Sequence, residues 1–130
     1  MTDQAAIDNF LAEKKLAVVG VSHEKNKFGN IVYRRLRAHG FEVFAINPKI
    51  KVIEGDPCYP NLAALPEPIG GVVIVVPPKE AKQVVIDAAA SGIKRVWMQP
   101  GAESDEAVRF CEEHGIEVIY GLCIMTLSGS

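Results

Sequence analysis

Short apolar runs that alternate with helical patterns are the feature that most constrains the fold of this sequence. The runs are rich in valine and isoleucine and are mostly continuous, and they read LAVVGV (16–21), EVFAI (42–46), GVVIVV (71–76), RVWM (95–98) and EVIYG (117–121). Strands that are buried on both faces of a parallel sheet have this composition. The runs therefore predict a parallel sheet that is covered by helices on both sides.

Helical patterns fill the gaps between the apolar runs. Helices are expected at 30–38, 79–90 and 104–114, and a further N-terminal helix is expected to pack through Ile7, Phe10 and Leu11. Glycine closes these helices in the phrases HGFEV, SGIKRV and HGIEV, where it ends the helix in a left-handed conformation before the next strand. This repeated order predicts one doubly wound α/β domain over residues 1–130, with about five parallel strands.

The amino-acid composition restricts the classes of partner that this protein is expected to bind. The 14 basic and 16 acidic residues give a net charge of −2, which argues against a nucleic-acid partner. No apolar run approaches the roughly 18 residues of a membrane span, so no membrane partner is expected. The N-terminal residues do not resemble a secretory signal, and the 3 cysteines form no CxxC motif. We therefore expect a cytoplasmic location.

Ligands of an open parallel sheet bind beyond the carboxyl ends of the strands, near the point where the strand order reverses. In this sequence, those ends are followed by the segments 20–30, 47–51, 77–80, 99–104 and 121–125. Functional residues are expected in these segments.

The first of these segments carries the chemistry of an anion site. Gly20 allows a tight turn after the strand, and Gly29 allows close backbone approach at the start of a helix. The free N–H groups of a helix N-terminus favour phosphate, and Ser22, Lys25 and Lys27 add a hydroxyl and positive charge. This combination suits a pyrophosphate.

The second segment indicates an additional phosphate. A dinucleotide site of the GxGxxG type has an acidic residue at the end of its second strand, where it accepts from a ribose hydroxyl. Here Asn47, Pro48 and Lys49 stand at that place, followed by Lys51, and Ser22 replaces the second glycine. Lysines suit a phosphorylated ribose, so both NADP and coenzyme A (CoA) remain candidates on these residues alone.

The motifs VVGVSHEKNKFGN, VFAINPK, VVIVVPP, VWMQPGAES and GLCIM occur in this order between residues 16 and 125. This arrangement resembles the small CoA-binding domain proteins, which are stand-alone relatives of the nucleotide-binding domain in the alpha subunit of succinyl-CoA synthetase. The resemblance implies a Rossmann-like domain that holds CoA at the carboxyl ends of its strands.

The resemblance also implies roles for individual positions. Those that would cradle the pyrophosphate are Gly20, Ser22, Lys27, Phe28 and Gly29. Those that would surround the adenosine part are Asn47, Pro48, Lys49, Val76 and Pro77. Those on the pantetheine side would be Gln99, Pro100 and Gly101, and the candidate set also takes in Val21 and Met98.

Of the other residues, one is a candidate for reaction with the ligand, and the rest are expected to have structural roles. Cys123 follows the fifth run, at the ligand-binding edge, where it could form a mixed disulfide with the CoA thiol. Trp97 is expected in the core. Residues 56–60 are expected to form a connection in which Tyr59 packs locally.

The expected function is a CoA-binding module without catalysis of its own. The phosphorylated histidine and the ATP-grasp partner that CoA ligases of this superfamily need are not evident, and no Ser–His–Asp arrangement is evident either. The ligand would be free CoA, an acyl-CoA or a CoA disulfide. The alternatives are an NADP-dependent oxidoreductase and a CoA-binding regulatory subunit of a larger enzyme. A homodimer through the N-terminal helix is also open.

Overall fold

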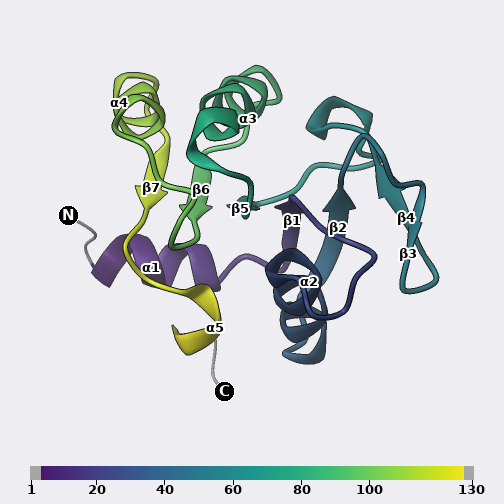
Figure 1. The fold of residues 1–130 in the computed structure, drawn as a ribbon. Helices are drawn as coiled ribbons and strands as arrows, with labels where there is room; N and C mark the ends of the chain where they lie inside the picture. The colour runs from purple at the N-terminus through teal and green to yellow at the C-terminus, as the bar shows by residue number, and fades with distance from the viewer. Residues whose placement is uncertain (1–3, 128–130) are drawn as a thin grey trace.

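The computed structural model describes residues 4–127, which form an α/β fold with helices on both faces of one sheet (Figure 1). The strands are β1 (Lys15–Val19), β2 (Glu42–Ile46), β3 (Val52–Ile53), β4 (Asp56–Tyr59), β5 (Gly71–Ile74), β6 (Arg95–Met98) and β7 (Glu117–Ile119). The helices are α1 (Gln4–Leu11), α2 (Phe28–Ala38), α3 (Pro78–Ala90), α4 (Asp105–Glu113) and α5 (Ile124–Leu127), with a 3₁₀ turn η1 (Leu62–Ala64). The predicted fold class is confirmed.

The strand order places a topological switch point beside β1. The sheet has 7 strands in the order β3-β4-β2-β1-β5-β6-β7. All of its neighbouring strands pair in parallel except β3 and β4, which are antiparallel. The chain moves outward from β1 through β2 to the β3–β4 edge and then crosses to β5 on the other side of β1. The order therefore reverses between β1 and β5, where doubly wound folds bind ligands.

Both faces of the sheet are buried, which explains why the strands are continuously apolar. In β1, Leu16 and Val18 face the cluster formed with α1, α2 and α5. Ala17 and Val19 face the opposite cluster, formed with α3, α4 and η1. Figure 1 shows α3 and α4 above the sheet and α1, α2 and α5 below it. Alternate side chains of one strand thus enter two different hydrophobic cores.

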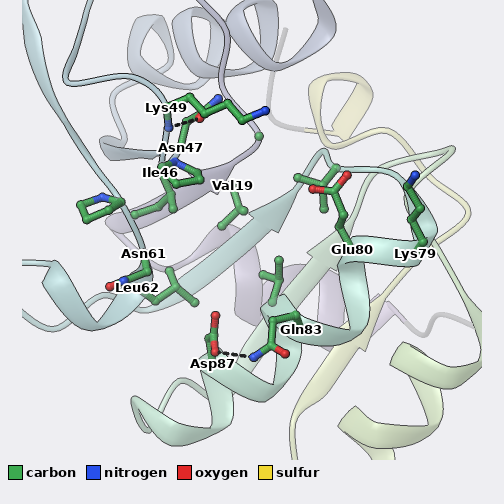
Figure 2. A pocket seen from close by; sticks show the side chains of 15 residues that line it. Val19, Ile46, Asn47, Lys49, Asn61, Leu62, Lys79, Glu80, Gln83 and Asp87 are labelled. Atoms are coloured by element: carbon green, nitrogen blue, oxygen red, sulfur yellow. Dashed lines mark hydrogen bonds between the residues drawn. The ribbon is translucent and has the colours of Figure 1, made fainter.

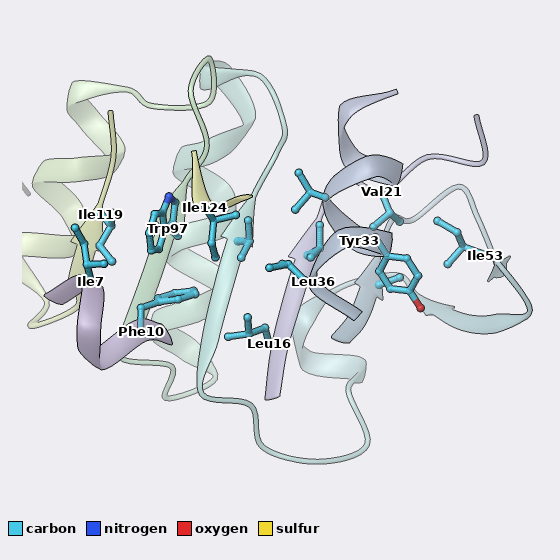
Figure 3. Packing of buried hydrophobic residues seen from close by; sticks show 14 of the residues in the cluster. Ile7, Phe10, Leu16, Val21, Tyr33, Leu36, Ile53, Trp97, Ile119 and Ile124 are labelled. Atoms are coloured by element: carbon cyan, nitrogen blue, oxygen red, sulfur yellow. The ribbon is translucent and has the colours of Figure 1, made fainter. Parts of the chain in front are cut away.

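The N-terminal helix is a covering element of the sheet. Ile7 and Phe10 of α1 are buried, and the Phe10 ring meets the Trp97 ring edge-on with 5.4 Å between centroids (Figure 3). The indole Nε1 of Trp97 donates to the Leu122 carbonyl at 2.9 Å, so Trp97 is a satisfied core residue, as expected. The apolar face of α1 therefore packs on its own sheet, and a homodimer through this helix remains a prediction.

The strand count is the main correction to the predicted fold. Residues 56–59 do not form a connection but the strand β4, which pairs with β2 and makes a hairpin with β3. Glu54 and Gly55 turn the hairpin with φ of 49° and 81°, the left-handed pair that a tight hairpin needs. Proline at position 57 and the short length of both strands hid the hairpin from the sequence pattern. Tyr59 does pack locally, with its ring 6.3 Å from that of Phe44.

Candidate functional site

A cavity of about 500 Å³ opens at the carboxyl ends of β1, β2, β4 and β5 and extends along α3 (Figure 2). It therefore lies at the switch point of the sheet. Its lining comprises Val19, Gly20, Ile46, Asn47, Pro48, Lys49, Pro60, Asn61, Leu62, Val76, Lys79, Glu80, Gln83, Val84 and Asp87.

The cavity combines apolar walls with polar groups at its ends. Figure 2 shows Lys49 and Lys79 on opposite sides of the cavity, with Glu80 beside Lys79 and with Gln83 and Asp87 farther along α3. Gln83 Nε2 donates to Asp87 Oδ1 at 2.9 Å, and Glu80 lies one turn before them on the same helix. The apolar side chains of the lining are those of Val19, Ile46, Pro48, Pro60, Leu62, Val76 and Val84. An apolar slot with Lys49 on one side and Lys79 on the other fits a heterocycle that carries phosphates.

Gly20, in the loop between β1 and α2 (the first loop), is in direct contact with Gly29 at the start of α2. Gly20 has a φ of 106°, a left-handed conformation that favours glycine. A Cβ on Gly29 would lie 2.0 Å from the Gly20 carbonyl oxygen, so this position excludes any side chain. The start of α2 therefore packs against Gly20, which is one of the residues that line the cavity. Lys27 provides no side-chain cap. The N–H groups of Asn30 and Ile31 donate to the Lys27 carbonyl at 3.1 Å, and those of Phe28 and Gly29, which come before them, have no partner within the helix.

A buried asparagine holds the same loop in place. Asn30 is fully buried, and its Nδ2 donates to the Ser22 carbonyl at 2.7 Å and to Glu54 Oε2 at 3.3 Å. Its Oδ1 accepts from Arg34 Nε at 2.6 Å, and Arg34 Nη2 donates to the Lys25 carbonyl at 3.0 Å. These bonds tie two loop carbonyls to side chains of α2.

Asn47 completes this arrangement from the other side. Its Nδ2 donates to the Val21 carbonyl at 2.8 Å, and its Oδ1 accepts from the Lys49 N–H at 2.8 Å. Its own N–H donates to the Tyr59 carbonyl at 2.9 Å. The Asn-Pro-Lys segment is therefore fixed both to the first loop and to β4, which sets the position of Lys49 at the cavity. A loop held in this way is preorganised for a ligand.

The structure brings only part of the predicted set together. Five predicted residues line the cavity: Gly20, Asn47, Pro48, Lys49 and Val76. The remaining predicted residues lie outside the lining. They are in the first loop (Val21, Ser22 and Lys27), at the start of α2 (Phe28 and Gly29), after β5 (Pro77) or near the ends of β6 and β7 (Met98, Gln99, Pro100, Gly101 and Cys123). Contact of these residues with a ligand remains a prediction.

Three predicted residues are core residues in this structure. Val21 is 1% exposed, and Met98 and Gln99 are 0% exposed. Gln99 Oε1 accepts from the Ile124 N–H at 2.8 Å, and its Nε2 lies 3.3 Å from the Cys123 sulfur. Gln99 therefore connects the end of β6 to the start of α5, and its side chain is buried in this structure.

One wall of the cavity was predicted only in part: the segment 77–80 was expected to be functional, but no residue of this wall was named as a candidate. Its residues come from α3 and from the segment after β4, and the polar ones are Asn61, Lys79, Glu80, Gln83 and Asp87. Polar residues on the outward side of an amphipathic helix look like a solvated surface. The available signal was Pro-Pro-Lys-Glu directly after β5, which places the start of α3 at the ligand-binding edge.

The three thiols differ in accessibility. Cys58 and Cys111 are buried, whereas Cys123 is partly exposed. Burial raises the pKa of the Cys111 thiol to about 12 and also raises that of Cys58. Because the thiolate is the reactive form, iodoacetamide at pH 8 should modify Cys123 first in the folded protein. Peptide mass spectrometry that finds Cys111 modified at an equal rate would contradict this burial, and modification in denaturant provides the control.

Comparisons with known proteins agree with this geometry. Residues 14–128 match the CoA binding domain family. A conserved hypothetical protein from Pyrococcus furiosus superposes with a TM-score of 0.84 at 45% identity, covering 88% of this chain and 98% of that one. A hypothetical protein from Pyrococcus horikoshii gives a TM-score of 0.91 at 32% identity, covering 97% of this chain and 89% of that one.

A larger enzyme is also related to this chain. The Acetate–CoA ligase [ADP-forming] I of Archaeoglobus fulgidus is 30% identical over 121 residues, which are 85% of this chain but 18% of the ligase. This chain thus spans less than a fifth of that relative. Within residues 4–127, no helix is long and apolar enough to cross a membrane. The family match over 14–128, the fold and the cavity at the switch point lead to one conclusion: the chain belongs to the CoA binding domain family.

Proposed function

We propose that this protein binds CoA at the switch-point cavity and acts as a binding module without catalysis of its own. The observation that carries the proposal is the cavity itself, an apolar slot beside Lys49 that ends at the glycine contact between the first loop and α2. CoA has matching parts: an adenine, a pyrophosphate and a 3′-phosphate. The family match supports this ligand.

Each part of the ligand has a group of suitable chemistry. The adenine fits between the apolar walls that β5 and α3 contribute, including Val76 and Val84. The pyrophosphate fits the N-terminus of α2, where unpaired N–H groups and the helix dipole favour an anion. Lys49 would hold the 3′-phosphate, because it stands where a dinucleotide site carries an acidic residue.

The composition of the lining supports a binding role. Among the described residues, the cavity lining contains no histidine or cysteine, and its Asp87 carboxylate accepts a hydrogen bond from Gln83. The ligase activity belongs to relatives of which this chain covers a small part. We place the protein in the cytoplasm, where the free thiols Cys58, Cys111 and Cys123 are stable.

Replacing Lys49 with alanine should weaken CoA binding by about 1 kcal/mol, roughly fivefold in Kd, through loss of a charge-assisted contact. The effect should almost vanish with dephospho-CoA, which lacks the 3′-phosphate. Lys51→Ala provides the matched control, because it removes the same charge two residues away and outside the cavity lining. Equal losses for CoA and dephospho-CoA, measured by calorimetry, would show that Lys49 does not read this phosphate.

A further inference from the structure

The cavity occupies only one half of the ligand-binding edge. Its lining comes from β1, β2, β4, β5, η1 and α3 with their connections, and no lining residue follows Asp87 in the sequence. The ends of β6 and β7 contribute nothing to it. The part of the site that encloses a ligand is therefore the half whose chemistry suits a nucleotide.

The other half of the edge, at the ends of β6 and β7, is largely exposed among the described residues, apart from a smaller cavity beside α4. Met98 and Gln99 are fully buried there, and Gln99 already has its hydrogen bonds within the protein. Gly101 and Gly121 are exposed, and a Cβ added to either would meet nothing within 4 Å. Leu122, beside them, is 39% exposed. A pantetheine arm that leaves the cavity toward this half would lie on a solvent-exposed surface.

From this asymmetry we infer that the protein recognises the nucleotide end of CoA and is indifferent to what its sulfur carries. The inference rests on the proposed function, and it names the ligand class as CoA together with its thioesters. A protein distinguishes two ligands only through a difference in the free energy of its contacts with them. An acyl group on a sulfur in solvent makes no such contact, so CoA and acetyl-CoA should bind alike.

One hollow near the open half bears on this inference. A cavity of about 230 Å³ lies beside α4 and is lined by Glu103, Ser104, Asp105, Val108, Arg109, Glu112 and Tyr120. Three of these side chains are carboxylates, which do not favour an apolar acyl chain. It is nevertheless the place where an acyl group would bind if the inference were wrong.

Calorimetric titration of the full chain tests the inference with CoA, acetyl-CoA, butyryl-CoA, 3′-phospho-ADP and pantetheine. The three CoA compounds should agree within about threefold in Kd, and 3′-phospho-ADP should bind within about tenfold of CoA. Pantetheine should give no saturable heat. A preference of more than about tenfold for one acyl state, or failure of 3′-phospho-ADP to bind when CoA does, would overturn the inference.

Two variants make the test specific to position. Gln83→Ala, inside the cavity, should weaken the binding of CoA and of 3′-phospho-ADP by the same factor, because both ligands fill the cavity with their nucleotide part. Leu122→Ser, on the open half, should leave CoA and acetyl-CoA binding unchanged. If Leu122→Ser weakens acetyl-CoA selectively, the sulfur end is recognised and the inference fails. If no CoA compound binds at all, the proposed function fails instead, so the two failures are distinguishable.

Discussion

Gly29→Ala should lower the free energy of unfolding by about 3 kcal/mol, measured by denaturant titration. The added methyl would lie 2.0 Å from the Gly20 carbonyl oxygen and 3.1 Å from the Cα of Val21, and neither backbone atom can move without displacing the first loop. Because that loop borders the cavity, CoA affinity should fall as well.

The sign of this effect is diagnostic, because helix propensity alone predicts the opposite. Alanine is the better helix former by about 1 kcal/mol, so an uncrowded Gly29 would tolerate or favour the change. Gly92→Ala is the matched control. Gly92 has a φ of 77° but open space around it. Alanine at this position should therefore lower the free energy of unfolding only through the strain of the left-handed conformation, by about 1–2 kcal/mol. A Gly29→Ala protein as stable as the wild type would contradict the close contact of loop and helix.

Asn30→Asp should destabilise the protein by about 2–4 kcal/mol at neutral pH. The substitution keeps the shape of the side chain but replaces the Nδ2 donor with an oxygen, which then faces the Ser22 carbonyl and the Glu54 carboxylate in a fully buried place. The loss of stability should be accompanied by weaker CoA binding, because the loop carbonyl is released. Denaturant titration and calorimetry measure the two effects.

Two further variants separate this network from a general effect of added charge. Asn26→Asp makes the same chemical change at an exposed position of the same loop and should cost little. Glu54→Gln, added to Asn30→Asp, removes one of the facing carboxylates and should restore part of the stability. If Asn26→Asp is as harmful as Asn30→Asp, or if Glu54→Gln restores nothing, the buried network does not hold the loop.

The core of the fold could be predicted because its physical cause is local. β1, β5 and β6 are buried nearly throughout and β2 and β7 in part, and their runs of apolar residues express this directly. β3 and β4 could not be found in the same way, because they are short, half exposed and contain Pro57. Their position depends on pairing with β2, which no local pattern encodes.

The candidate site was predictable where chemistry follows a strand end directly. Asn47 comes immediately after an apolar run, Lys49 follows two residues later, and Val76 ends another run; all three line the cavity. Gln83 and Asp87 lie within a helix, and only the packing of α3 beside β5 turns them toward the cavity. The role of Asn30 was hidden for the same reason, since its partners are backbone carbonyls and side chains that the fold alone brings near.

The most direct test of the central claim is calorimetric titration of the full chain with CoA, NADP and NAD under identical conditions, alongside thermal unfolding with each ligand. The account predicts one saturable site for CoA, binding at least about tenfold weaker for NADP and NAD, and a rise in Tm that follows the measured Kd. NADP binding as tight as or tighter than CoA would contradict the account and favour an oxidoreductase. No heat and no Tm shift with CoA would contradict it equally.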